Sequence, residues 1–181
     1  MYSELIESVL TDCQLPIVVV GHSFGGRVAV HLACRRPGAI AGLVLTGAPL
    51  LHATDRQGRP AFRYRVGRRL HQMGLLPDHR LEGLRDRYGS ADYRAAEGVM
   101  RGVLVTTVNE SYERQLGSIA APVELLWGEL DDAAPTEIAT RAEALMVNAH
   151  LTVLEGVGHF TPTEAPHELR RAIDRLLGGA T

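Results

Sequence analysis

Residues 16–26 read PIVVVGHSFGG, and this stretch decides the fold. The run from Pro16 to Val20 is apolar and β-branched with no polar alternation, which predicts a strand buried on both faces of a parallel sheet. After the glycines, apolar residues at 28, 29, 32 and 33 recur at helical spacing. The stretch therefore predicts a strand, a tight turn that carries Ser23, and a helix.

The same alternation continues along the rest of the chain. Short apolar runs at 42–46, 123–127 and 151–154 predict three further buried strands. Helical spacing of apolar residues marks helices at 138–145 and 169–177. Strands that alternate with helices indicate an α/β fold, with a mostly parallel sheet flanked by helices.

Residues 49–119 interrupt this rhythm. They contain no convincing strand, but they include helical patterns and an arginine-rich run at 56–69. We interpret this run as a solvated helix face in preference to an anion-binding patch. The expected organisation is an α/β core at 1–48 and 120–181, with a helical cap or lid inserted at 49–119.

Composition limits the classes of function. A chain of 181 residues with 45% hydrophobic content can bury one sizeable core. The net charge of −2 gives no electrostatic reason to expect nucleic acid or an anionic membrane as partner. The N-terminus begins with acidic residues and the longest apolar run, 15–20, is far too short to span a bilayer. We expect a cytoplasmic protein that binds a small molecule and needs no metal and no cofactor.

Residues 21–25 match the pattern G-x-S-x-G. In this pattern the serine lies on a sharp strand-to-helix turn, so that its hydroxyl projects from the sheet. Glycines on either side, here Gly21 and Gly25, remove Cβ atoms that would clash in the turn. Because the match lies between a predicted strand and a predicted helix, we identify Ser23 as a nucleophile and not as part of a glycine-rich turn alone.

A serine hydroxyl becomes nucleophilic when a histidine accepts its proton. His159 is the best placed base, because the glycine loop at 156–160 follows the last predicted strand and can bring the imidazole to the edge where Ser23 lies. His150 precedes that strand and His167 falls in the next helix, so both are expected at the surface. His22 is expected to line the turn and to contact the substrate.

A carboxylate must orient this histidine. The segment WGELDDAAP at 127–135 follows the third predicted strand and carries Asp131 and Asp132. Their spacing from the strand does not choose between the two.

Three motifs together resemble the α/β-hydrolase superfamily. They are G-H-S-x-G-G at 21–26, W-G-E-x-D-x-x-x-P at 127–135 and G-x-G-H at 156–159, in the family's order of serine, acid and histidine. The resemblance implies that Asp131 is the acid and that the backbone N–H of Phe24 stabilises the oxyanion.

The implied activity is that of a serine hydrolase that cleaves a carboxylic ester or a related acyl substrate through Ser23, His159 and Asp131. Thioester, carbon–carbon-bond and perhydrolase or acyl-transfer chemistry use the same triad and stay open. Family members with an aspartate nucleophile are disfavoured because position 23 is serine.

The sequence departs from the family at its N-terminus. Family members carry further strands before the strand that leads into the serine turn, here called the elbow strand (16–20), and a His-Gly loop among them supplies another oxyanion amide. This sequence begins at the helix before the elbow strand. We therefore expect the elbow strand to lie at an exposed apolar edge, which favours self-association or pairing with an N-terminal half. The alternative function is a non-catalytic or partner-dependent hydrolase fragment with low or no activity.

Overall fold

The computed structural model describes residues 10, 13, 14, 16–52, 77 and 110–178. Within this part, one sheet holds four parallel strands in the order β1-β2-β3-β4. The strands are β1 (Ile17–His22), β2 (Ile40–Thr46), β3 (Val123–Gly128) and β4 (Ala149–Leu154). The helices are α2 (Phe24–Arg35), the 3₁₀ turn η1 (Pro37–Ala39), α7 (Glu113–Ser118), α8 (Thr136–Leu145), α9 (Thr161–Glu164) and α10 (Pro166–Gly178).

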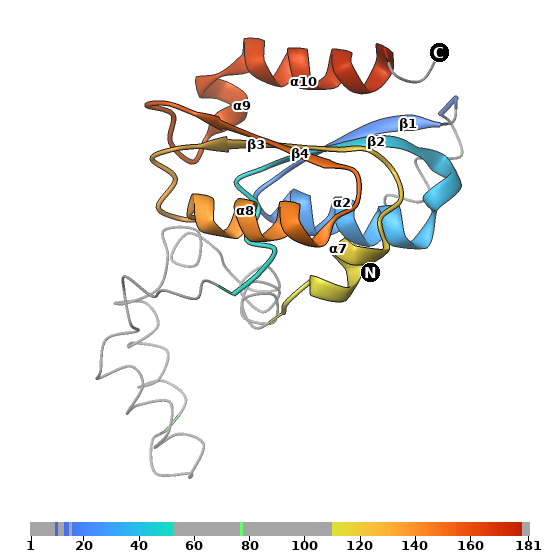
Figure 1. Ribbon diagram of the computed structural model, residues 1–181, viewed down its shortest axis with the longest axis horizontal. Helices are drawn as coiled ribbons and strands as arrows, with labels where there is room; N and C mark the ends of the chain where they lie inside the picture. The colour runs from blue at the N-terminus through green and yellow to red at the C-terminus, as the bar shows by residue number, and fades with distance from the viewer. Residues whose placement is uncertain (1–9, 11–12, 15, 53–76, 78–109, 179–181) are drawn as a thin grey trace. The chain divides into compact units, whose positions relative to one another are not determined.

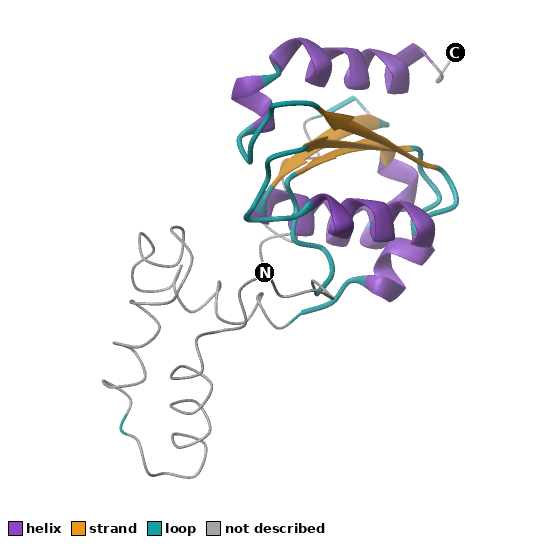
Figure 2. Ribbon diagram, turned by 60° about the vertical axis from the view of Figure 1, so that its left-hand side comes forward, coloured by secondary structure: helices purple, strands orange, loops and turns teal. Residues whose placement is uncertain are grey.

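Helices cover both faces of this sheet, as the sequence predicted (Figure 1). Helices α2 and α8 pack on one face of the sheet, where the larger core cluster lies, and α10 packs on the other face (Figure 2). A smaller apolar cluster, which includes Val44, Leu126 and Leu176, fills the space beneath α10. Of the helices described, none has the length and apolar character needed to cross a membrane.

The chain divides into two compact units, one formed by residues 1–53 and 111–181 and the other by 54–110. Almost all of 54–110, including the arginine-rich run, lies outside the described residues, so the helical cap stays a prediction. Helix α7 falls inside the range assigned to that cap, but it packs against α2 and α8 in the first unit. Its residue Leu116 is fully buried in the core.

Burial differs between the inner and the outer strands. Every residue of β3 is buried, and so is every residue of β2 apart from Ala41. Strand β1 is only partly buried, because within the described part it pairs with β2 alone, and Val20 is 42% exposed. Strand β4 has no buried residue. The expectation of strands buried on both faces was therefore wrong for β1 and for β4, whereas the expected exposed edge at β1 is present in this part of the chain.

The chain leaves and re-enters the first unit at two adjoining backbone segments. The N–H of Tyr112 donates a hydrogen bond to the carbonyl of Leu50 at 3.0 Å. The buried Arg27 of α2 donates to the carbonyl of Pro49 and lies over the Tyr112 ring, 5.7 Å from its centroid. Residues 49–50 and 112 thus form a closed neck at the ends of the intervening segment.

An ion pair fixes α10 to the sheet. Arg175 donates to both carboxylate oxygens of Glu124 in β3, at 3.1 and 2.7 Å. Glu124 is only 8% exposed, and its hydrogen bond raises the pKa of Arg175 above the ordinary value. A nearly buried carboxylate therefore depends on one cation of α10.

Replacing Arg175 with alanine should lower the free energy of unfolding by about 1–3 kcal/mol, because Glu124 would lose its partner while remaining buried. Arg171→Ala is the matched control on the same helix, since Arg171 pairs with Glu168 on the exposed surface. Its cost should stay below about 0.5 kcal/mol. Urea unfolding followed by circular dichroism measures both values, and equal losses would contradict the anchoring role.

Candidate active site

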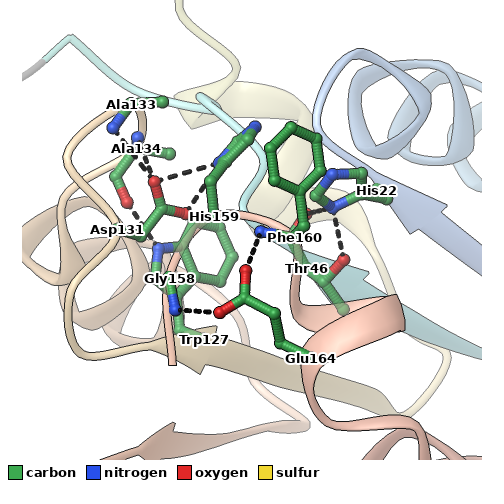
Figure 3. Close-up of polar contacts among 10 residues, drawn as sticks. All are labelled: His22, Thr46, Trp127, Asp131, Ala133, Ala134, Gly158, His159, Phe160 and Glu164. Carbon is green, nitrogen blue, oxygen red and sulfur yellow. Dashed lines mark hydrogen bonds and ion pairs between the residues drawn. The ribbon is translucent and has the colours of Figure 1, made fainter. Parts of the chain in front are cut away.

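The predicted site residues lie at one edge of the sheet. Ser23 follows β1, Thr46 ends β2, Asp131 follows β3 and His159 follows β4. Because parallel strands end at the same edge, their carboxyl-terminal loops lie side by side, at the edge of the sheet where ligands bind in open α/β folds. Figure 3 shows the polar contacts that join the end of β1 to the end of β2, and the loop after β3 to the loop after β4.

Ser23 occupies a strained turn. Its N–H continues the ladder between β1 and β2 by donating to the Thr46 carbonyl at 2.9 Å. Its backbone then turns with φ 50° and ψ −119°, and it is the only non-glycine residue with positive φ in the described part of the chain. This conformation matches the first central position of a type II′ turn, where glycine is preferred. A serine held there carries strain on the order of 1–3 kcal/mol.

Two glycines let β1 and α2 approach each other at this turn. A Cβ on Gly21 would lie 2.7 Å from the Cα of Gly26, and a Cβ on Gly26 would overlap the side chain of Ala48. A Cβ on Gly25 would meet no described atom within 4 Å. The prediction that a side chain would clash in the turn is thus confirmed for Gly21 and wrong for Gly25. The second position where a side chain would clash is Gly26.

Asp131 and His159 form a hydrogen-bonded pair. The Nδ1 atom of His159 lies 3.0 Å from each carboxylate oxygen of Asp131. The Asp131 side chain is fully buried, and its Oδ1 also accepts from the N–H groups of Ala133 and Ala134 at 3.0 and 2.8 Å. An ionised carboxylate only accepts, so Nδ1 donates the proton and Nε2 is left as an acceptor.

Of the two aspartates that spacing left open, the one that contacts His159 is Asp131. Asp132 is exposed on the same turn. The turn itself is fixed by the indole of Trp127, whose Nε1 donates to the carbonyl of Ala134 at 2.7 Å. The indole thus binds the end of the turn whose N–H groups donate to Asp131.

Two glycines that the sequence interpretation missed make room for this pair. Gly47 has φ 53°, and a Cβ there would lie 3.0 Å from both Asp131 Oδ2 and His159 Nδ1. A Cβ on Gly128 would overlap the backbone of Val157 and Gly158. Each glycine directly follows a predicted strand, at the edge of the sheet that carries the site. This position in the sequence could have indicated that both glycines border the site.

His22 lines the site from the end of β1. Its Nδ1 lies 2.9 Å from the hydroxyl oxygen and 3.2 Å from the carbonyl oxygen of Thr46. Its ring centroid is 5.0 Å from that of His159 and 6.1 Å from that of Phe160 (Figure 3). The ring therefore connects the turn that carries Ser23 with the histidine loop, and its contact with a substrate stays a prediction.

The other two histidines considered as bases lie away from this edge. His150 lies inside β4 near its start, and not before the strand as the sequence suggested. His167 lies in the first turn of α10, and both side chains belong to exposed residues. Among the described residues, no group of three or more His, Cys, Asp or Glu is placed to hold a metal ion.

Comparison with known proteins places the chain beside hydrolases. Residues 2–172 match the Alpha/beta hydrolase family. An uncharacterized protein of Mycobacterium tuberculosis is 27% identical over 198 residues, which cover 89% of this chain and 55% of the relative. The uncharacterized hydrolase YugF of Bacillus subtilis is 29% identical over 182 residues, which cover 91% of this chain and 66% of the relative.

The fold is shared with solved structures. A putative lipase from Acinetobacter baumannii superposes with a TM-score of 0.66 at 20% identity, covering 97% of this chain and 65% of that one. The chain spans 55% to 66% of the length of the two curated relatives.

Replacing Gly26 with alanine should lower the free energy of unfolding by about 1–3 kcal/mol, because the added methyl would overlap Ala48. Gly25→Ala, one residue earlier in α2, adds the same methyl into open space and should stay within about 1 kcal/mol of the wild type. Urea unfolding measures the difference. Similar losses in both variants would contradict the assignment of the close contact to Gly26.

Proposed function

Because the chain belongs to the Alpha/beta hydrolase family, we propose that it is a serine hydrolase acting on a carboxylic ester or a related acyl substrate. The observation that carries the proposal is the hydrogen-bonded pair of the buried Asp131 and the partly buried His159, at the sheet edge where Ser23 follows β1. Because Nδ1 donates its hydrogen to the carboxylate, the basic Nε2 atom on the other side of the ring faces away from it.

In the proposed reaction, Nε2 of His159 accepts the hydroxyl proton of Ser23 as Oγ bonds to the substrate carbonyl carbon. The carbonyl oxygen becomes an oxyanion, and the N–H of Phe24 donates a hydrogen bond to it. Phe24 begins α2, where the positive end of the helix dipole favours negative charge. Asp131 stabilises the imidazolium that His159 becomes.

The intermediate then loses its alcohol. The bond between the carbonyl carbon and the alcohol oxygen breaks, and Nε2–H gives its proton to that oxygen, leaving the acyl group on Ser23. Water attacks this acyl group with the same histidine as base, and the carboxylic acid leaves as Ser23 regains its proton. Thioester, carbon–carbon-bond and acyl-transfer reactions would use the same three side chains.

The substrate would meet an aromatic rim. Phe160 is 61% exposed beside His159, and its ring lies near that of His22. We therefore place His22 among the substrate contacts and expect an acyl substrate with an apolar portion near these rings. A small, uncharged ester is consistent with the net charge of −2, because this charge gives no electrostatic attraction for a polyanionic substrate.

A second candidate is a hydrolase fragment that depends on a partner. It is favoured by the 42% exposure of Val20 on β1. Within the described part β1 has one neighbouring strand. In this alternative, another copy or an N-terminal half pairs with β1 before the site becomes active.

A fluorophosphonate probe should modify Ser23 and no other serine, because only Ser23 has the G-x-S-x-G pattern in the sequence, and among the described serines only Ser23 lies in a strand-to-helix turn. Ser23→Ala should abolish the labelling, which tryptic mass spectrometry locates. Labelling at Ser90, Ser111 or Ser118 would contradict the assignment of the nucleophile. Absence of labelling in the folded chain would favour the partner-dependent candidate.

Asp131→Asn should lower the turnover of a p-nitrophenyl ester by up to about 10⁴-fold, because the amide favours the wrong tautomer of His159. Asp132→Asn removes the same charge from the exposed neighbouring position and should leave turnover nearly unchanged. Initial rates per folded molecule provide the comparison. A larger loss in the Asp132 variant would show that the acid is assigned one residue too early.

A further inference from the structure

The peptide groups on both sides of His159 bind one carboxylate. The N–H of Gly158 donates to Oε2 of Glu164 at 2.8 Å, and the N–H of Phe160 donates to Oε1 at 3.0 Å (Figure 3). We propose that Glu164 is a positioning residue that sets the orientation of the His159 imidazole through these two bonds. The inference rests on the proposed function of His159 as the base.

The two bonds restrict the backbone at the one residue between them. Fixing the peptide N–H of Gly158 and of Phe160 limits how far the chain at His159 can rotate, and so fixes the direction of its Cα–Cβ bond. At the other end of the side chain, Asp131 holds Nδ1. Backbone and ring are thus held from two sides, and the direction of Nε2 follows from both.

Glu164 is itself fixed to the loop that it binds. It ends the short helix α9, and its own N–H donates to the carbonyl of Phe160 at 2.9 Å. The N–H of Thr163 donates to the same carbonyl at 2.9 Å. The side chain and the backbone of α9 therefore close a compact ring with residues 158–160.

The geometry demands two acceptors at one side chain. A carboxylate offers both oxygens as acceptors, whereas the amide of glutamine offers one oxygen and would turn an N–H₂ donor toward the other peptide N–H. Glutamine at 164 therefore keeps the size of the side chain but loses one of the two bonds. Aspartate keeps the charge but is shorter by one methylene, so it does not reach both N–H groups.

Glu168 offers a matched control. It lies four residues later on α10 and bonds to Arg171 at the exposed surface, at 2.9 Å. Glu168→Gln removes the same charge without touching the histidine loop. A change seen in Glu164→Gln and absent in Glu168→Gln therefore belongs to the loop and not to net charge.

The experiment compares the full chain with its Glu164→Gln, Glu164→Asp and Glu168→Gln variants in three measurements. Proton NMR observes the hydrogen that His159 Nδ1 donates to Asp131, which needs no turnover. The rate of fluorophosphonate labelling at Ser23 reports the strength of the base, and thermal unfolding reports stability.

Both Glu164 variants should lose or broaden the Nδ1 proton resonance and label at least about tenfold more slowly, because small displacements of a catalytic group cost up to about 10² in rate. The midpoint of thermal unfolding should change little, since Glu164 is exposed and water can bind the released N–H groups. Glu168→Gln should match the wild type in all three measurements.

A Glu164→Gln variant with the wild-type resonance and labelling rate would overturn the inference. A Glu164→Asp variant that keeps the wild-type resonance and labelling rate would also overturn it, because the effect would then depend on charge alone. A loss of labelling rate that a lower unfolding midpoint fully explains would overturn it as well. If the wild type is not labelled at all, the proposed function fails separately, and the resonance still decides whether Glu164 orients His159.

Discussion

The Asp131 side chain is fully buried and accepts hydrogen bonds from two different loops. A buried carboxylate without donors would cost several kcal/mol, so its turn and the histidine loop must both be in place for either to be stable. The absence of side chains at Gly47 and Gly128 gives the room for that approach. The edge of the sheet is therefore assembled as a unit and not as independent loops.

The strain at Ser23 is sustained by the same assembly. Its N–H is bound by Thr46 and its carbonyl accepts from the N–H of Gly26 at 3.1 Å, so the residue is held on both sides of the unusual turn. Thr46 in turn contacts His22, whose ring packs near His159. The backbone that presents the hydroxyl and the side chain proposed to deprotonate it are thus connected through the end of one inner strand.

The sequence predicted features whose causes are local. Continuous apolar runs predicted β2 and β3, and the glycine-rich turn between a strand and a helix predicted the conformation at Ser23. Spacing could not choose between Asp131 and Asp132, because the choice depends on a histidine 28 residues away; the family resemblance supplied it. Gly26 and Glu164 escaped notice for the same reason, since the contacts with Ala48 and with the N–H of Gly158 exist only after folding. The partial exposure of β1 was hidden because an apolar run does not reveal how many neighbouring strands it has.

The closed neck formed by residues 49–50 and 112 has a consequence for how such a protein can diversify. Its hydrogen bond, reinforced by Arg27, holds the ends of the segment between them side by side. Loop-closure entropy grows slowly with length, by about 0.6 kcal/mol for each doubling. An insertion or deletion between these two ends should therefore cost the sheet little, because the contacts that hold the ends together are made by residues 27, 49–50 and 112 and are not altered.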